Sequence, residues 1–169
     1  YVGHGLENLM AELLPGFDPA EGVRRYREHH PAVTVAGTRL FPGVADTLAD
    51  LHRRGLRMAV CSNKAVAFTR ELVQALGVAG LFHAVLGPDD VAGRAKPDPA
   101  MLLEGLRRLE VSAADAVYVG DMAVDVHAGR AAGVRVWLVE GGATGTESAA
   151  AAGPDRVLTG FAELAELLP

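Results

Sequence analysis

Two aspartates in the second half of the chain have the type and spacing of residues that could hold a cation beside a phosphate group. Asp121 follows the β-prone run Val117–Gly120, and Asp125 comes four residues later, on the first turn of a predicted helix. This spacing directs both carboxylates into one small volume at a strand end, where open α/β sheets bind their ligands. Mg²⁺ and a lysine ammonium group are the usual partners of such carboxylates. Taken alone, the pattern is equally compatible with a helix N-cap and a surface carboxylate.

A hydroxyl and an amide come together at Ser62 and Asn63, directly after the apolar run 56–61. If that run is a buried strand, these side chains and the free N–H groups at its end form a cradle suited to a phosphate group. The alternative is a turn in which the two residues cap the following helix.

Lys96 lies in a segment stiffened by Pro97 and Pro99. The residue before a proline is kept out of the helical region, so we expect Lys96 to be extended. A lysine held in this way can neutralise a phosphoryl group together with the carboxylates of Asp121 and Asp125. The alternative is an exposed lysine in a loop.

The elements that must position these residues alternate between strands and helices. Hydrophobic patterning predicts helices at 44–53, 66–76, 99–109, 124–132 and 161–168, and strands at 56–61, 82–86, 117–120, 134–139 and 156–158. This alternation is typical of an α/β fold with a parallel, doubly wound sheet of the Rossmann type.

The N-terminal residues have a different pattern. Apolar spacing predicts a helix at 5–14 and a second at 19–30, with Asp18 as its N-cap and Pro31 as its end. We therefore divide the chain into a small helical part, 1–38, and an α/β core, 39–169.

Composition excludes several classes of function. The 169 residues are 50% hydrophobic, enough for one core and a small appendage, and the net charge of −5 leaves no basic stripe for nucleic acid. The single cysteine excludes an internal disulfide and a thiolate zinc site, and a reducing cytoplasm is the simplest setting. No apolar run reaches the ~20 residues that span a bilayer, so we expect no membrane partner. The oligomeric state stays open.

Taken in order, a serine after a strand, a Lys-Pro pair and Gly-Asp-x-x-x-Asp resemble the haloacid dehalogenase superfamily. The local sequences at 40–43, 61–64, 93–99 and 119–121 are similar to its phosphoglycolate phosphatase branch, and the resemblance runs from residue 2 to residue 168. It implies a Rossmann-type core with a small helical cap, of which 1–38 would be the second part.

The resemblance also implies roles for the residues above. Ser62 would bond the phosphoryl group with Asn63 beside it, and Lys96 would bind that group and steady the nucleophile. Asp121 would be a Mg²⁺ ligand, and Asp125 would support either the metal's water shell or Lys96.

The implied function is Mg²⁺-dependent hydrolysis of a small phosphorylated metabolite, with 2-phosphoglycolate favoured. Alternatives are a pyrophosphatase or a sugar-phosphate mutase of the same fold, and a non-catalytic phosphate-binding protein. A dehalogenase is less expected, since the Gly120-Asp121 metal site suits phosphoryl transfer.

One departure from the family pattern has a structural consequence. The family's reaction starts at an Asp-x-Asp motif on a central strand, and the 169 residues contain no such motif; Asp89-Asp90 matches a different position. The resemblance implies a missing segment of about 50 residues, with a strand between those ending at Cys61 and Val119. We therefore expect that these residues are part of a longer chain, or that the gap closes by rearrangement or is filled by another chain. Without the Asp-x-Asp motif, the 169 residues should be inactive. If a central strand is missing, the strands on either side of it lie ~9.6 Å apart and should not pair directly with each other.

Overall fold

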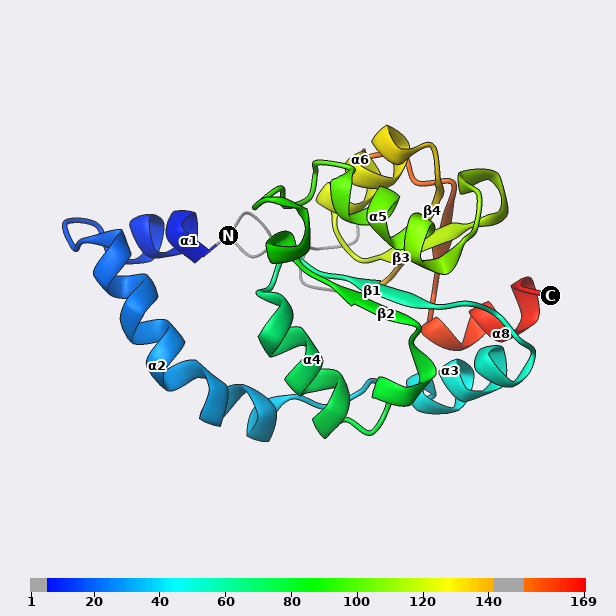
Figure 1. The fold of residues 1–169 in the computed structure, drawn as a ribbon, viewed down its shortest axis with the longest axis horizontal. Helices are drawn as coiled ribbons and strands as arrows, with labels where there is room; N and C mark the ends of the chain where they lie inside the picture. Colours follow the sequence, from blue (N-terminus) through cyan, green and yellow to red (C-terminus); the bar gives the residue numbers. More distant parts are fainter. Residues whose placement is uncertain (1–5, 142–150) are drawn as a thin grey trace.

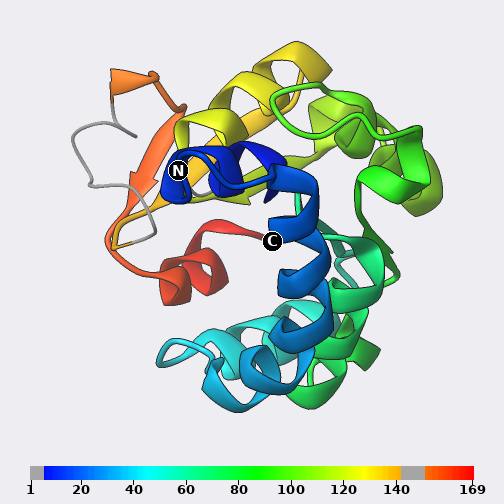
Figure 2. The same cartoon turned by 90° about the vertical axis from the view of Figure 1, so that its left-hand side faces the viewer.

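The computed structural model describes residues 6–141 and 151–169 (Figure 1). A pair of helices comes first, α1 (Leu6–Leu13) and α2 (Pro19–Gly37), and lies at one end of the molecule beside the α/β part. Asp18 accepts a hydrogen bond from the Ala20 N–H at 3.0 Å, as expected of the N-cap that the sequence predicted. Figure 2, which faces this end, shows α2 running across the α/β elements behind it.

The second helix is longer than predicted. The prediction ended it at Pro31, because a proline lacks the N–H that continues the helical bonding, but α2 runs on to Gly37. A proline removes one hydrogen bond and bends a helix without necessarily ending it. The connection to the next helix, α3, therefore begins at Thr38.

The α/β part follows the predicted alternation closely. Its helices are α3 (Val44–Arg53), α4 (Val66–Ala75), α5 (Ala100–Leu109), α6 (Ala123–Ala132) and α8 (Leu164–Leu167), and its strands are β1 (Ala59–Cys61), β2 (Ala84–Leu86), β3 (Val117–Gly120), β4 (Arg135–Val139) and β5 (Arg156–Leu158). Short 3-10 turns, η1 (Ala79–Leu81), η2 (Pro88–Val91), η3 (Ala113–Asp115) and η4 (Phe161–Glu163), complete the connections. The last predicted helix is thus a 3-10 turn followed by one turn of α-helix.

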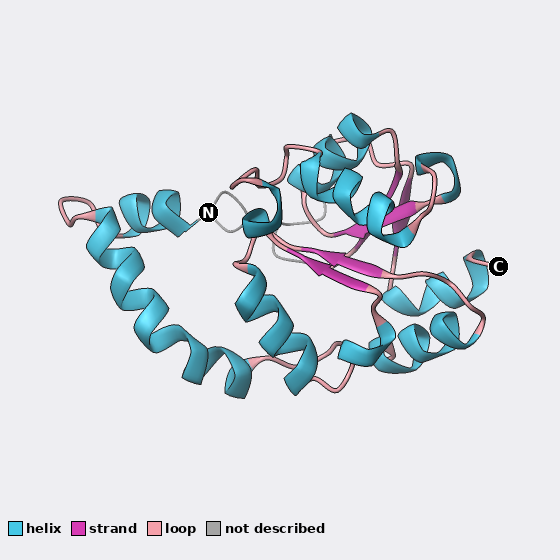
Figure 3. Ribbon diagram, viewed as in Figure 1, coloured by secondary structure: helices cyan, strands magenta, loops and turns pink. Residues whose placement is uncertain are grey.

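The strands form parallel sheets, as predicted, but they are divided between two of them (Figure 3). In the first sheet β1 pairs with β2, with Cys61 beside Leu86. In the second, β4 lies between β3 and β5, and Gly120 is beside Leu138. Both sheets are parallel throughout, so the carboxyl ends of their strands share a direction within each sheet.

Within the described residues, β1 and β3 are not paired with each other. This is the arrangement that the hypothesis of an intervening strand requires, since direct pairing would have contradicted it. The intervening strand itself stays a prediction.

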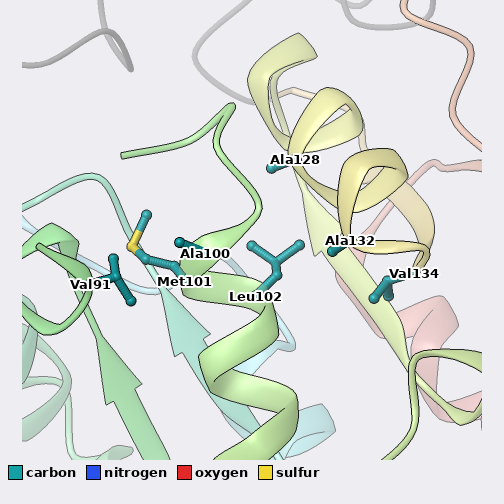
Figure 4. Close-up of a cluster of buried hydrophobic side chains, with 7 residues drawn as sticks. All are labelled: Val91, Ala100, Met101, Leu102, Ala128, Ala132 and Val134. Atoms are coloured by element: carbon teal, nitrogen blue, oxygen red, sulfur yellow. The ribbon is translucent and has the colours of Figure 1, made fainter. Parts of the chain in front are cut away.

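Helices cover both faces of the β3–β4–β5 sheet. On one face the buried core lies around α5 and α6, and Figure 4 shows its side chains: Val91, Ala100, Met101, Leu102, Ala128, Ala132 and Val134. On the other face Trp137 and Leu158 pack with Leu51 of α3 and Leu164 of α8. Side chains of β3 alternate between the two faces, so Tyr118 points to the α5–α6 side.

Across residues 6–141 and 151–169, no helix has the length and apolar character needed to cross a bilayer.

Candidate active site

The end of β1 carries the predicted phosphate cradle. The hydroxyl of Ser62 accepts a hydrogen bond from the Lys64 N–H at 3.2 Å, which closes a short turn after the strand. The first N–H of α4, at Val66, donates instead to Asp89 Oδ2 at 2.8 Å. The helix start thus has its acceptor in Asp89, so Ser62 is not the residue that caps Val66.

Asn63 holds the main chain of Lys96 through two hydrogen bonds. Its Oδ1 accepts from the Lys96 N–H at 2.7 Å, and its Nδ2 donates to the Lys96 carbonyl at 2.9 Å. The amide thereby pairs with Lys96 as an adjacent strand would. Asn63 was predicted to bind the phosphate group; in the structure its amide bonds the segment that carries Lys96.

The ammonium group of Lys96 lies between the ends of β1 and β3. It donates to Asp125 Oδ1 at 2.8 Å, to the Tyr118 hydroxyl at 2.7 Å and to the Cys61 carbonyl at 3.0 Å. The Lys96 and Asp125 side chains are only 10% and 4% exposed. Lys96 is therefore not the exposed loop lysine of the alternative interpretation, but half of a buried ion pair.

Asp125 has a second set of contacts on its other oxygen. Oδ2 accepts from the N–H groups of Asp121 at 3.1 Å and Met122 at 3.0 Å, which precede α6 and so have no carbonyl acceptor within that helix. One carboxylate thus fixes the strand-to-helix turn with one oxygen and binds Lys96 with the other. Asp125 was expected to support either the metal's water shell or Lys96, and in the structure it contacts Lys96.

Asp121 lies at the carboxyl end of β3 with a half-buried side chain. Among the described residues, no group of three His, Cys, Asp or Glu side chains is close enough to hold a metal ion. Mg²⁺, however, is commonly bound through one or two carboxylates, with waters and substrate phosphate completing the shell. Asp121 at the end of β3 fits that pattern as a carboxylate ligand, whereas Asp125 is engaged with Lys96 and two N–H groups.

Two further groups at this site are kept neutral by their surroundings. Burial and the neighbouring Asp125 carboxylate raise the pKa of Tyr118 well above its usual range. Burial also raises the pKa of the Cys61 thiol to about 11, although the Lys96 charge opposes this. Cys61 is partly buried and donates weakly to the Met101 carbonyl at 3.5 Å, and a thiol with a raised pKa is a poor nucleophile.

Tyr118 is the site residue that sequence reasoning missed, because it was used only as a β-prone residue. Its hydroxyl contacts Lys96, Asp125 Oδ1 at 3.1 Å and the Cys61 carbonyl at 3.2 Å. Two facts in the sequence could have indicated it. Tyr118 precedes the predicted site residue Asp121 by three positions, and a tyrosine in a predicted buried strand needs a hydrogen-bond partner for its hydroxyl.

The adjacent carboxylates Asp89 and Asp90 are used by the fold. Asp89 bonds the start of α4, and Asp90 accepts from the Gly87 N–H at 3.1 Å and pairs with Arg108 at 3.0 Å. Burial tends to raise the pKa of Asp90, but the Gly87 bond and Arg108 outweigh it and lower that pKa below its ordinary value. Asp90 therefore remains ionised as half of an ion pair.

Comparison with known proteins adds independent evidence. Residues 1–139 match the model of the haloacid dehalogenase-like hydrolase family. A plasmid phosphoglycolate phosphatase of Cupriavidus necator is 36% identical over 174 residues, which cover 99% of this chain and 75% of the relative.

Solved structures agree with this match. CbbY of Rhodobacter sphaeroides, solved in complex with phosphate, is 30% identical with a TM-score of 0.80, over 95% of this chain and 75% of CbbY. A variant of CbbY in complex with xylulose-(1,5)-bisphosphate is 29% identical with a TM-score of 0.80, over 96% of this chain and 76% of CbbY. These findings support a phosphatase activity, and the chain belongs to the haloacid dehalogenase-like hydrolase family.

Proposed function

We propose that the full-length protein hydrolyses a small phosphomonoester, with 2-phosphoglycolate as its preferred substrate and Mg²⁺ as its cofactor. The observation that carries the proposal is the buried Lys96–Asp125 ion pair at the strand ends. Ser62 directly follows Cys61, whose carbonyl accepts from Lys96, and the Asp121 N–H donates to Asp125. The phosphoglycolate phosphatase of C. necator supports the substrate.

Lys96 binds the phosphoryl group electrostatically. A positive charge held away from water interacts more strongly with the negative charge that develops on the phosphoryl oxygens than it would in bulk solvent. Asp125 keeps that charge in place, and Asn63 fixes the main chain from which it extends. The Ser62 hydroxyl donates a hydrogen bond to a phosphoryl oxygen, while its oxygen keeps accepting from Lys64.

Asp121 would hold Mg²⁺ together with waters and the phosphoryl group. When bound, Mg²⁺ acts as a Lewis acid that neutralises negative charge on the phosphoryl oxygens. Asp121 is also linked to the ion pair, because its N–H donates to Asp125.

The nucleophile and the general acid would come from an Asp-x-Asp motif outside these 169 residues. The first aspartate would attack phosphorus while the second protonates the leaving alcohol; water would then hydrolyse the aspartyl phosphate, releasing inorganic phosphate and restoring the carboxylate. The residues of this chain orient the phosphoryl group through both steps.

Release of inorganic phosphate from 2-phosphoglycolate, pyrophosphate and glucose 1-phosphate tests the proposal. The full-length protein should turn over 2-phosphoglycolate with the highest kcat/KM, and EDTA should abolish turnover until Mg²⁺ is restored. Turnover of the 169 residues alone would contradict the assignment of the nucleophile, and a preference for pyrophosphate would contradict the substrate.

A phosphorylated sugar is the second candidate substrate. A variant of CbbY, 29% identical to this chain, was solved with xylulose-(1,5)-bisphosphate. Including this bisphosphate in the same assay separates the two candidates, because they share the phosphoryl site and differ only in the remainder of the substrate.

A further inference from the structure

The three N–H bonds of the Lys96 ammonium group are all used by the protein. An ammonium group has three donors, and Lys96 directs them to Asp125, Tyr118 and the Cys61 carbonyl at 2.8, 2.7 and 3.0 Å. For Lys96 to bond a phosphoryl oxygen directly, one of these three acceptors has to be exchanged for that oxygen.

The three acceptors differ in what they would lose. Asp125 is a buried carboxylate, and removing a cation from it leaves a charge with less compensation. The Cys61 carbonyl is a main-chain acceptor at the end of β1, and without Lys96 it would depend on the Tyr118 hydroxyl, whose single proton is shared with Asp125.

Tyr118 is different because its hydroxyl is both acceptor and donor. If Lys96 withdraws, the hydroxyl keeps its own donated bond, for which Asp125 Oδ1 at 3.1 Å and the Cys61 carbonyl at 3.2 Å are both within reach. The hydroxyl is uncharged, so no buried charge loses its partner. Tyr118 is therefore the acceptor that Lys96 can release at the smallest loss.

We propose that the Tyr118 hydroxyl holds the Lys96 N–H that a phosphoryl oxygen takes on binding, and so competes with the ligand for this donor. The proposal rests on the proposed function of Lys96 as a phosphate ligand. Tyr118 is a positioning residue in this account: it keeps the ammonium group aimed at the strand ends and gives it up when the ligand arrives.

The competition predicts an unusual direction for Tyr118→Phe. In the phosphate-free state, the substitution removes the Lys96–Tyr118 bond. In the phosphate-bound state, this bond is already replaced by one to phosphate, so the substitution removes nothing from Lys96. By linkage, phosphate should therefore bind more tightly to the variant, by about three- to tenfold. A tyrosine with a merely structural role would leave the affinity unchanged or weaken it.

Calorimetric titration of the full-length protein with inorganic phosphate tests this. Tyr26→Phe, on α2, is the matched control that removes the same atom elsewhere, and it should keep the wild-type dissociation constant. In a Lys96→Met background, Tyr118→Phe should no longer tighten binding, because the shared donor is gone. Tighter binding in Tyr118→Phe alone supports the proposal; unchanged or weaker binding overturns it.

A measurement on the wild-type protein does not depend on the variant folding. With ¹³C-labelled tyrosine, saturating phosphate should shift the Cζ resonance of Tyr118 and leave that of Tyr26 in place, and a Tyr118 resonance that does not respond would overturn the proposal. Failure of the wild-type protein to bind phosphate at all would instead overturn the proposed function, on which this inference depends.

Discussion

Gly120 and Asp125 pack so closely that there is no room for a side chain between them. A methyl group on Gly120 would lie 2.5 Å from both Cβ and Cγ of Asp125 and 2.6 Å from its Oδ2. The glycine at the end of β3 is thus the residue that lets the carboxylate reach back to the N–H groups of Asp121 and Met122 and forward to Lys96.

Gly120→Ala should therefore displace the Asp125 carboxylate and loosen Lys96. We expect the free energy of unfolding to fall by about 1 to 3 kcal/mol and kcat/KM to fall by at least about tenfold. Gly80→Ala is the control, because a methyl group there meets no atom within 4 Å. Equal effects of the two substitutions on kcat/KM would refute this role for Gly120.

The buried ion pair should matter far more to stability than an exposed one. Asp125→Ala leaves the Lys96 charge without its partner and should lower the free energy of unfolding by about 3 to 5 kcal/mol. Glu110→Ala breaks the Arg57–Glu110 pair, whose side chains are 49% and 80% exposed, and should change it by less than about 1 kcal/mol. Urea unfolding followed by the fluorescence of Trp137, the chain's single tryptophan, measures the free energy of unfolding of both variants. Similar decreases in the two variants would contradict a stabilising role for the Lys96–Asp125 pair.

Asn63 can be tested as a structural residue or as a phosphate ligand. Asn63→Ala removes both bonds to the Lys96 main chain and should lower the free energy of unfolding by about 1 to 3 kcal/mol even without phosphate. Urea unfolding with and without phosphate distinguishes the roles. A variant with wild-type stability that has lost only phosphate affinity would show that Asn63 binds the ligand directly.

The partly buried thiol of Cys61 should make the free energy of unfolding fall at alkaline pH. Burial raises its pKa from the ordinary value of 9.0 to about 11, so the unfolded chain loses this proton at lower pH than the folded protein does. The contribution of the thiol is complete below about pH 9 and is lost as the pH rises towards about 11. Between about pH 7 and about pH 10, the wild type should lose about 1.4 kcal/mol more stability than Cys61→Ala. Parallel pH profiles in urea unfolding would exclude a raised pKa.

Elements with a regular hydrophobic pattern could be predicted from the sequence, and α3 has the predicted bounds, Val44–Arg53. Strands β3 and β5 also have the predicted bounds, but β1, β2 and β4 begin later than predicted. In β1 the reason is that apolar side chains pack before the first paired residue: Leu56 and Met58 contact the core, although β1 begins at Ala59. The predicted end of α2 was wrong because a proline inside a helix removes one hydrogen bond, and the bonds on either side of Pro31 are enough to continue the helix to Gly37.

The chemistry at the strand ends could be predicted by residue type, but not the bonds between distant residues. The sequence placed Lys96 and Asp125 at one site, and the structure has them in contact. The bonds from Asn63 to Lys96 join residues 33 positions apart, and the Tyr118–Cys61 bond joins residues 57 positions apart. Such contacts depend on which strands become neighbours, and no local pattern carries that information.

The central claim is that Lys96 is the cation that binds the phosphoryl group. Steady-state turnover of 2-phosphoglycolate by full-length Lys96→Met and Lys64→Met tests it most directly, because Lys64 is the other lysine of the chain and lies in the same β1-to-α4 turn as Ser62. Losing a charge-assisted contact to the phosphoryl group should lower kcat/KM by at least about a hundredfold in Lys96→Met, while Lys64→Met stays within about threefold of wild type. A folded Lys96→Met protein with wild-type kcat/KM would contradict the account.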